Sequence, residues 1–269
     1  MHRPSSMANQ QNNISTIITS TKPINDENYY KATWAHRAWF ATGCTAVLIS
    51  LAKSILIISK MPPAPKTCLH LTLAAALGYL LADLVSGIYH WAVDNYGSAA
   101  TPIFGSQIES FRAHHQHPSE ITKCETAGIL YTLAAVTAAA VTPVNVFSGD
   151  PVLLAFVGVF AGCSMFSIKF HAWAHVPRKR LPAVVAALQD AGILMRLSQH
   201  APHHRPPYNS NYCTVSGIWN RVLDETKVLA AVEAALYRVT GVRPRSWSEP
   251  ISEWTPRTQM LDEMKPASF

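Results

Sequence analysis

The chain has 269 residues, of which 49% are hydrophobic and only 14% carry a charged side chain. Because soluble domains usually carry about 25% charged residues, this composition excludes a disordered chain and a charge-rich coiled coil. The formal net charge is +6, with no basic run interleaved with aromatic residues, so we expect no nucleic-acid partner. The five cysteines are odd in number and form no CxxC pair, which favours reduced thiols in a non-secreted protein.

The apolar residues are concentrated in four runs, each close to the roughly 20 residues that an α-helix needs to cross a bilayer. The runs cover residues 38–59, 68–93, 127–149 and 152–168. The last two contain no charged residue, whereas Lys53 interrupts the first and Asp83 the second. Buried helices of a soluble protein are the alternative, but four such runs in one chain favour an all-α integral membrane protein with about four transmembrane helices.

Breaks and composition divide the rest of the chain. The segments MPPAP at 61–65 and SGDP at 148–151 end one run and start the next, and a polar connection covers 95–126. After PRKR at 177–180, we predict an amphipathic segment on the membrane surface over 181–197 and a helix over 228–240 that ends at Gly241.

The two ends of the chain differ from the main domain, which we place at 33–250. Residues 1–25 contain no acidic residue and many Ser, Thr and Asn, which is typical of an organelle transit peptide, with an ordinary disordered leader as the alternative. Residues 251–269 form a polar C-terminal tail.

Nine of the 12 histidines lie between His90 and His204. With four spans, the exit of the second span, the loop after it, the exit of the fourth span and all that follows share one face of the membrane. These positions hold His90, His114, His115, His117, His171, His175, His200, His203 and His204. We expect His2, His36 and His70 to be non-ligands. Most basic residues share the histidine face, so the positive-inside tendency predicts that it looks toward cytosol or stroma.

The spacing of these residues indicates a metal site. His90 and Asp94 are four residues apart and share one helix face, and so do His171 and His175. Imidazole suits iron, zinc and copper, and the clusters contain no cysteine. Eight or nine histidines with Asp94 exceed the four ligands of one zinc ion and fit a di-metal cap on one face. Glu-x-x-His pairs of soluble di-iron proteins are absent, which favours the membrane di-iron oxygenase class.

Two further expectations concern the stretch HAPHH at 200–204 and the polar residues near the candidate ligands. Pro202 permits a helix there only if it lies in the first turn. We expect Gln189, Asp190 and Gln199 to orient ring N–H groups of the ligating histidines.

Six segments together resemble a known family. They are GIYHWAVDNYG, ESFRAHHQHP, FHAWAH, LQDAGILMRLSQHAPHH, NYCTVSGIWN and GVRPRSWSEP. They are similar to the plant fatty acid desaturase 4 branch of a family that includes the plasmanylethanolamine desaturases, and the likeness covers about 33–250. Transferred to this chain, the resemblance implies as metal ligands His90, His114, His115, His171, His175, His200, His203 and His204. Asp94 matches the acidic residue after the first histidine, whereas His117, a further candidate by position, matches no family histidine.

The resemblance implies a membrane lipid desaturase that uses two iron ions and O2. For the plant branch it implies a trans double bond at carbon 3 of the palmitoyl chain of phosphatidylglycerol. It also implies a chloroplast membrane, thylakoid or envelope, with the metal face toward the stroma and ferredoxin as electron donor. The sequence leaves other functions open: a vinyl-ether-forming desaturase of alkyl ether phospholipids, in the endoplasmic reticulum with cytochrome b5 as donor, a membrane zinc hydrolase, or a metal-binding scaffold or transporter.

Overall fold

The structure is a computed structural model that describes residues 30–62, 64–102 and 104–248. The predicted leader over 1–25 and the predicted tail over 251–269 lie outside the described residues. From Ala32 onward the chain forms one unit, and its described elements are all helical. In order they are α2 (Trp34–Ile58), α3 (Pro65–Asn95), α4 (Gly105–Gln116), η2 (Pro118–Thr122), α5 (Thr126–Phe147), α6 (Pro151–Ala174), η3 (Arg178–Arg180), α7 (Ala183–Asp190), α8 (Leu197–His200), η4 (Ala201–His204), α9 (Ile218–Thr226), α10 (Val228–Thr240) and η5 (Arg245–Trp247).

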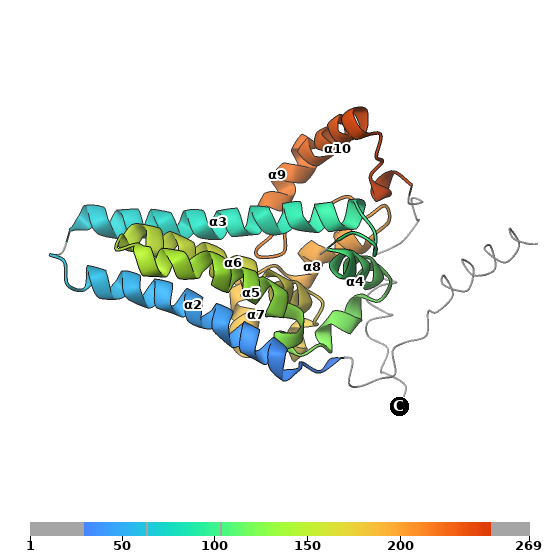
Figure 1. Ribbon diagram of the computed structural model, residues 1–269. Coiled ribbons are helices and arrows are strands. Elements are labelled where there is room, and N and C mark those ends of the chain that lie inside the picture. The colour runs from blue at the N-terminus through green and yellow to red at the C-terminus, as the bar shows by residue number, and fades with distance from the viewer. Residues whose placement is uncertain (1–29, 63, 103, 249–269) are drawn as a thin grey trace, which may run out of the picture. The chain divides into compact units, whose positions relative to one another are not determined.

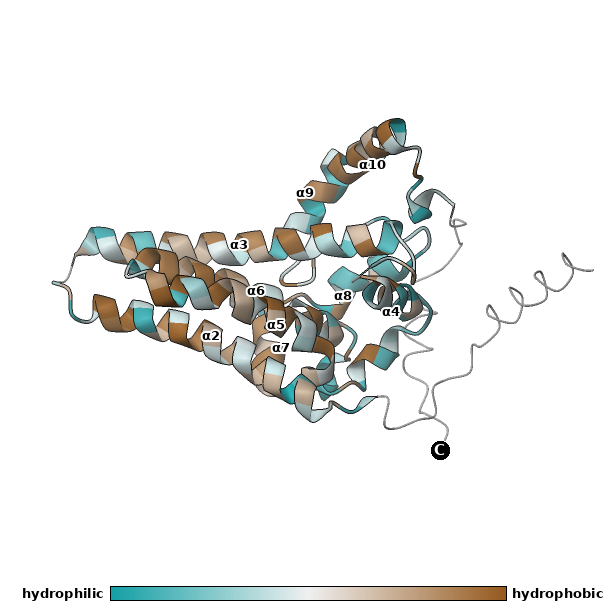
Figure 2. Ribbon diagram, in the orientation of Figure 1, coloured by the Kyte–Doolittle hydropathy of each residue, from teal (hydrophilic) through white to brown (hydrophobic). Residues whose placement is uncertain are grey.

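Four helices, α2, α3, α5 and α6, are long and apolar enough to cross a membrane. They correspond to the four apolar runs, so the predicted fold class is confirmed. The helices lie side by side, with α2 against α5 and α6, and α3 against α6 (Figure 1). Their apolar residues colour the bundle brown, whereas polar residues gather at the end that holds α4 and α8 (Figure 2).

Small residues let the long helices approach closely. A Cβ added to Gly43 of α2 would lie 2.7 Å from the carbonyl oxygen of Ala134 in α5. A Cβ on Gly78 of α3 would lie 2.8 Å from the carbonyl oxygen of Phe156 in α6. In lipid the hydrophobic effect does not drive helices together, so they associate largely through van der Waals packing, which close backbone contact increases.

Lys53, the charge inside the first apolar run, is accommodated within the bundle. Its Nζ donates to the carbonyl oxygens of Asn145 and Ser148, at 2.7 and 2.8 Å, where α5 ends. The last carbonyls of a helix lack partners within the helix and favour a cation nearby. The helix α2 is therefore continuous around Lys53, and the lysine joins two spans.

The C-terminal part of the chain departs from the predictions in one place. The predicted helix over 228–240 is confirmed as α10, and Gly241 follows it with a left-handed φ of 70°. The amphipathic segment predicted over 181–197 is shorter than expected, because α7 ends at Asp190. Gly192 then turns the chain with a φ of 73° before α8 begins. Helices α9 and α10 project away from α3 (Figure 1).

Candidate metal centre

One end of the bundle collects the predicted ligands from four parts of the chain. The last turns of α3 carry His90 and Asp94, and the last turn of α4 carries the adjacent pair His114 and His115. Helix α6 carries His171, with His175 directly after its end, and α8 and η4 supply His200, His203 and His204. All eight histidines and Asp94 are buried. The candidate ligands therefore come together where the helices end, as the predicted topology required.

Five of the histidines form one group that could hold a metal ion. Its members are His114, His171, His175, His200 and His204, with potential ligand atoms all within 4.8 Å of one another. Nε2 of His114 lies 3.0 Å from Nε2 of both His171 and His175. One ring proton can bridge only one such pair, so hydrogen bonds alone do not satisfy this arrangement. Two nitrogens about 2.1 Å from one ion, at a right angle, lie about 3.0 Å apart, so the spacing fits a shared ion.

The remaining four residues form a second group, which we call the aspartate group: His90, Asp94, His115 and His203. Oδ2 of Asp94 lies 3.3 Å from Nε2 of His90 and of His203, and 3.4 Å from Nε2 of His115. Both carboxylate oxygens of Asp94 and Nε2 of His90 are buried without a hydrogen-bond partner among the described residues. Buried polar atoms of this kind require a partner, and a metal ion at the convergence of the three rings would supply one.

Backbone carbonyls orient two of the rings in the aspartate group. Nδ1 of His90 lies 2.9 Å from the carbonyl oxygen of Tyr212, and Nδ1 of His203 lies 2.8 Å from that of Ser210. A carbonyl only accepts, so Nδ1 carries the proton and Nε2 presents its lone pair to the group. His115 is held differently, by stacking on the ring of Tyr208 with centroids 4.4 Å apart.

Burial keeps four of the histidines outside the spans neutral. It lowers the pKa of His175 to about 3 and the pKa of His114, His200 and His204 well below the usual range. The charges that neighbouring histidines would carry lower these pKa values further. Neutral imidazole is the form that binds metal, so these ligands need no deprotonation at neutral pH.

Several predicted site residues lie elsewhere. His117 is exposed after the last residue of α4 and belongs to neither group. Gln189 is buried, but its Nε2 donates to the carbonyl oxygen of Met195 at 2.8 Å. Asp190 is exposed and pairs with Arg178.

Gln199, the third residue expected to orient a histidine ring, accepts from the backbone N–H of Arg196 at 2.9 Å. These three side chains have other partners in the described part of the chain, and their expected role in orienting the histidines stays a prediction. The side chains of Gln189 and Gln199 instead form hydrogen bonds with the backbone of the turn between α7 and α8. Of the expected non-ligands, His36 stacks on Tyr131 and His70 is exposed, and neither belongs to the two groups. His2 lies outside the described residues.

Pro202 occupies the position that the sequence required. Helix α8 ends at His200, and the 3-10 turn η4 places Pro202 in its first turn. The change from α8 to η4 brings His200 and His204 into the five-histidine group and His203 into the aspartate group.

The sequence reasoning missed the role of Asp83, the one charge in the second apolar run. This carboxylate is fully buried in α3. Its Oδ1 accepts from the backbone N–H groups of Val215, Ser216 and Gly217 at 3.1, 2.8 and 3.0 Å, and its Oδ2 accepts from that of Trp219 at 3.4 Å. Asp83 thus anchors the loop that carries the Tyr212 carbonyl to His90. An isolated acid in an apolar run, seven residues before a ligand, was the available signal.

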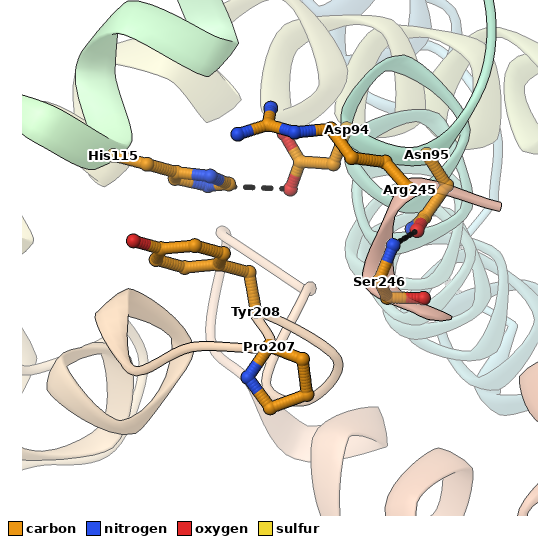
Figure 3. A pocket seen from close by; sticks show the side chains of 7 residues that line it. All are labelled: Asp94, Asn95, His115, Pro207, Tyr208, Arg245 and Ser246. Atoms are coloured by element: carbon orange, nitrogen blue, oxygen red, sulfur yellow. Dashed lines mark hydrogen bonds and ion pairs between the residues drawn. The ribbon is translucent and has the colours of Figure 1, made fainter. Parts of the chain in front are cut away.

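A small pocket opens beside the aspartate group (Figure 3). It is lined by Asp94, Asn95, His115, Pro207, Tyr208, Arg245 and Ser246. Oδ1 of Asn95 accepts from the backbone N–H of Ser246 at 3.0 Å, which ties the C-terminal segment to the end of α3. The lining therefore includes both the acid Asp94 and the basic residue Arg245.

The fold and the site define a class: a helical protein with four candidate membrane spans and two buried groups able to hold metal ions where the spans end. The lipid desaturase domain matches residues 79–247, which include all nine residues of the two groups. Fatty acid desaturase 4, chloroplastic, of Arabidopsis thaliana is 51% identical over 85% of this chain and 69% of its own length. Fatty acid desaturase 4-like 2, chloroplastic, of the same plant is 43% identical over 93% and 91%.

A more distant relative is the plasmanylethanolamine desaturase of Myxococcus xanthus, 34% identical over 64% of this chain and 62% of its own length. No solved structure matches the chain. The chain belongs to the lipid desaturase family, within its fatty acid desaturase 4 group.

Proposed function

We propose that the chain is a di-iron, O2-dependent lipid desaturase that places a trans double bond at carbon 3 of the palmitoyl chain of phosphatidylglycerol. The observation that carries the proposal is the pair of buried ligand groups at the ends of the spans, in a chain of the lipid desaturase family. Two relatives are named chloroplastic, which supports a chloroplast membrane as its location.

The donor set suits iron. The two groups offer eight imidazoles and one carboxylate, with no thiolate, and the five-histidine group exceeds the four ligands that zinc prefers. Bound iron supplies the oxidising chemistry that removes hydrogen from an unactivated C–H bond, which redox-silent zinc does not. The chain orients two rings through backbone carbonyls and keeps both groups buried from water.

The position of the groups suits the proposed bond. Carbon 3 of an acyl chain is close to the ester and therefore to the phospholipid headgroup. Both groups lie where the candidate spans end, at the depth of a membrane interface.

The reaction needs an electron donor. Formation of the double bond supplies two electrons and two protons, and the donor supplies two more electrons. Together with two protons from the solvent they reduce O2 to two water molecules. We propose ferredoxin as donor, with cytochrome b5 as the alternative, and a stromal orientation of the metal face. The pocket beside the aspartate group carries Arg245, and the +6 chain complements an acidic protein.

Lipid analysis of a plant line that lacks the endogenous protein tests the proposal. The line is complemented with this chain, with His203→Ala, or with His117→Ala as a matched control outside both groups. We expect trans-3-hexadecenoate in phosphatidylglycerol to return with the chain and with His117→Ala, but not with His203→Ala. If the unsubstituted chain accumulates and leaves this fatty acid absent, the proposed substrate is wrong.

A second candidate is desaturation of an alkyl ether phospholipid to a vinyl ether. The name of the Myxococcus xanthus relative favours it. Expression in a plasmalogen-deficient host separates the two, because only this activity restores plasmalogen. Metal analysis of the purified protein addresses the zinc hydrolase alternative, which requires stoichiometric zinc without iron.

A further inference from the structure

A cavity of about 120 Å³ lies beside the C-terminal end of α6, and none of the candidate metal ligands lines it. Its lining includes the basic side chains of Lys169 and Arg180, the indole of Trp173, and the apolar side chains of Val176 and Leu181. The volume is far above the roughly 10–15 Å³ that one water needs and near the roughly 150 Å³ that admits benzene. The cavity can therefore take a group of several heavy atoms.

The cavity contains positive charge without a protein partner. Lys169 is half-buried and Arg180 is exposed, and neither forms an ion pair in the part of the chain that the structure describes. Nζ of Lys169 lies 5.7 Å from the centroid of the Trp173 ring, so its near neighbour is an aromatic face. Asp190, the acid of α7, already pairs with Arg178. A half-buried cation without an acid beside it favours an anion from outside the chain.

The cavity and the metal ligands occupy different sides of α6. Lys169 and Trp173 lie two residues before and two residues after His171. Each residue turns the helix by about 100°, so their side chains point about 200° away from that of His171. His171 faces the five-histidine group, and the two lining residues therefore face away from it, with Trp173 packed against the apolar cluster of the α7 segment. A molecule in this cavity touches the side of α6 opposite His171.

We propose that this cavity binds the phosphate of an anionic phospholipid headgroup, from a lipid other than the one that reacts. The cavity lies near the end of a candidate span, where headgroups are found, and Trp173 has the amphipathic ring that residues at this depth share. Its apolar wall suits the glycerol backbone and the first carbons of the acyl chains. Basic pockets between membrane helices bind anionic headgroups in this way.

The test measures lipid binding by the purified full-length protein in detergent, without turnover, so it stands apart from the proposed desaturase activity. The probes are phosphatidylglycerol, phosphatidylcholine with the same acyl chains, and soluble glycerol phosphate. Native mass spectrometry gives the occupancy of each. The variants are Lys169→Gln, Arg180→Gln and the double substitution, with Lys179→Gln as a neighbouring exposed control. Lys169→Arg retains the charge and serves as the conservative variant.

We expect phosphatidylglycerol to bind more tightly than phosphatidylcholine, and glycerol phosphate to bind weakly because it lacks the acyl chains. Each lost cation should weaken phosphatidylglycerol binding about fivefold, since a basic residue near a membrane surface contributes about that factor. Lys179→Gln and Lys169→Arg should bind as the unsubstituted chain does. Equal binding of both phospholipids, or unchanged binding by the doubly substituted protein, would overturn the proposal. Tighter binding of an acidic protein than of lipid, lost in the same variants, would assign the cavity to a protein partner instead.

Discussion

Removal of the Asp83 carboxylate should destabilise the protein and disturb the aspartate group from a distance. In Asp83→Ala, three backbone N–H groups within 3.1 Å of Oδ1 lose their acceptor inside the protein, and the Trp219 N–H at 3.4 Å loses a weaker one. A buried donor left without a partner costs about 1–3 kcal/mol. Three such donors at the lower limit give a loss of about 3 kcal/mol in the free energy of unfolding.

Asp83→Asn refines the same prediction. The amide retains one oxygen for the three N–H groups, but it loses the negative charge and places an NH2 group opposite the Trp219 N–H. Hydrogen bonds to a charged acceptor contribute roughly twice as much as those to a neutral one. We therefore expect Asn to lose about half as much stability as Ala. Asp190→Asn is the matched control, because an exposed ion pair of this kind contributes little to stability.

The assay has two readouts on protein purified in detergent. Denaturant unfolding gives the change in stability, and metal analysis gives the iron content per chain. The loop anchored by Asp83 continues into Tyr212, whose carbonyl orients His90, so the alanine variant should also lose metal from the aspartate group while the five-histidine group keeps its own. If Asp83→Ala unfolds as Asp190→Asn does, the hydrogen bonds to Asp83 do not stabilise the loop and the reasoning is refuted.

Three further predictions follow from single contacts. His203→Ala should abolish desaturation while the protein accumulates in membranes, and His117→Ala should keep at least half of the rate; equal loss would place His117 among the ligands. Lys53→Met should lower the free energy of unfolding by about 2 kcal/mol, because the two hydrogen bonds from Lys53 to carbonyls at the end of α5 are lost. Lys60 is exposed, so Lys60→Met should change the free energy of unfolding little, and denaturant unfolding measures both variants. Glu233→Leu leaves the indole N–H groups of two tryptophans without their acceptor, so limited proteolysis should cut the segment after α10 faster than in the unsubstituted chain; unchanged cleavage would contradict this role.

The parts of the fold that the sequence predicted are those that depend on local pattern. Four apolar runs of membrane length specify four helices, and the alternation of faces places all the clustered histidines at one end. The i, i+4 spacing of His90 with Asp94 and of His171 with His175 determines which side chains point together. Partition into the five-histidine and aspartate groups did not follow from spacing, because it depends on how α4, α8 and η4 approach the ends of the spans.

The second shell was less predictable for a physical reason. Sequence reasoning selected polar side chains near the ligands, namely Gln189, Asp190 and Gln199. The structure uses the carbonyls of Ser210 and Tyr212 instead, and every residue has a carbonyl, so no residue type marks the position. The sequence can indicate such a backbone acceptor only through the residue that holds its loop in place. For the loop that carries Tyr212, that residue is Asp83.

The two buried carboxylates of α3 obey one rule. A carboxylate at membrane depth is costly unless strong donors or ions meet it, and both Asp83 and Asp94 have partners from outside α3. Backbone N–H groups of residues 215–219 meet Asp83, and the rings of His115 and His203 converge on Asp94. The segment after α8 therefore supplies partners to both acids. The span α3 and this segment should gain their stability together. Eight of the nine candidate ligands are imidazoles rather than carboxylates, which limits the negative charge that must be buried with them.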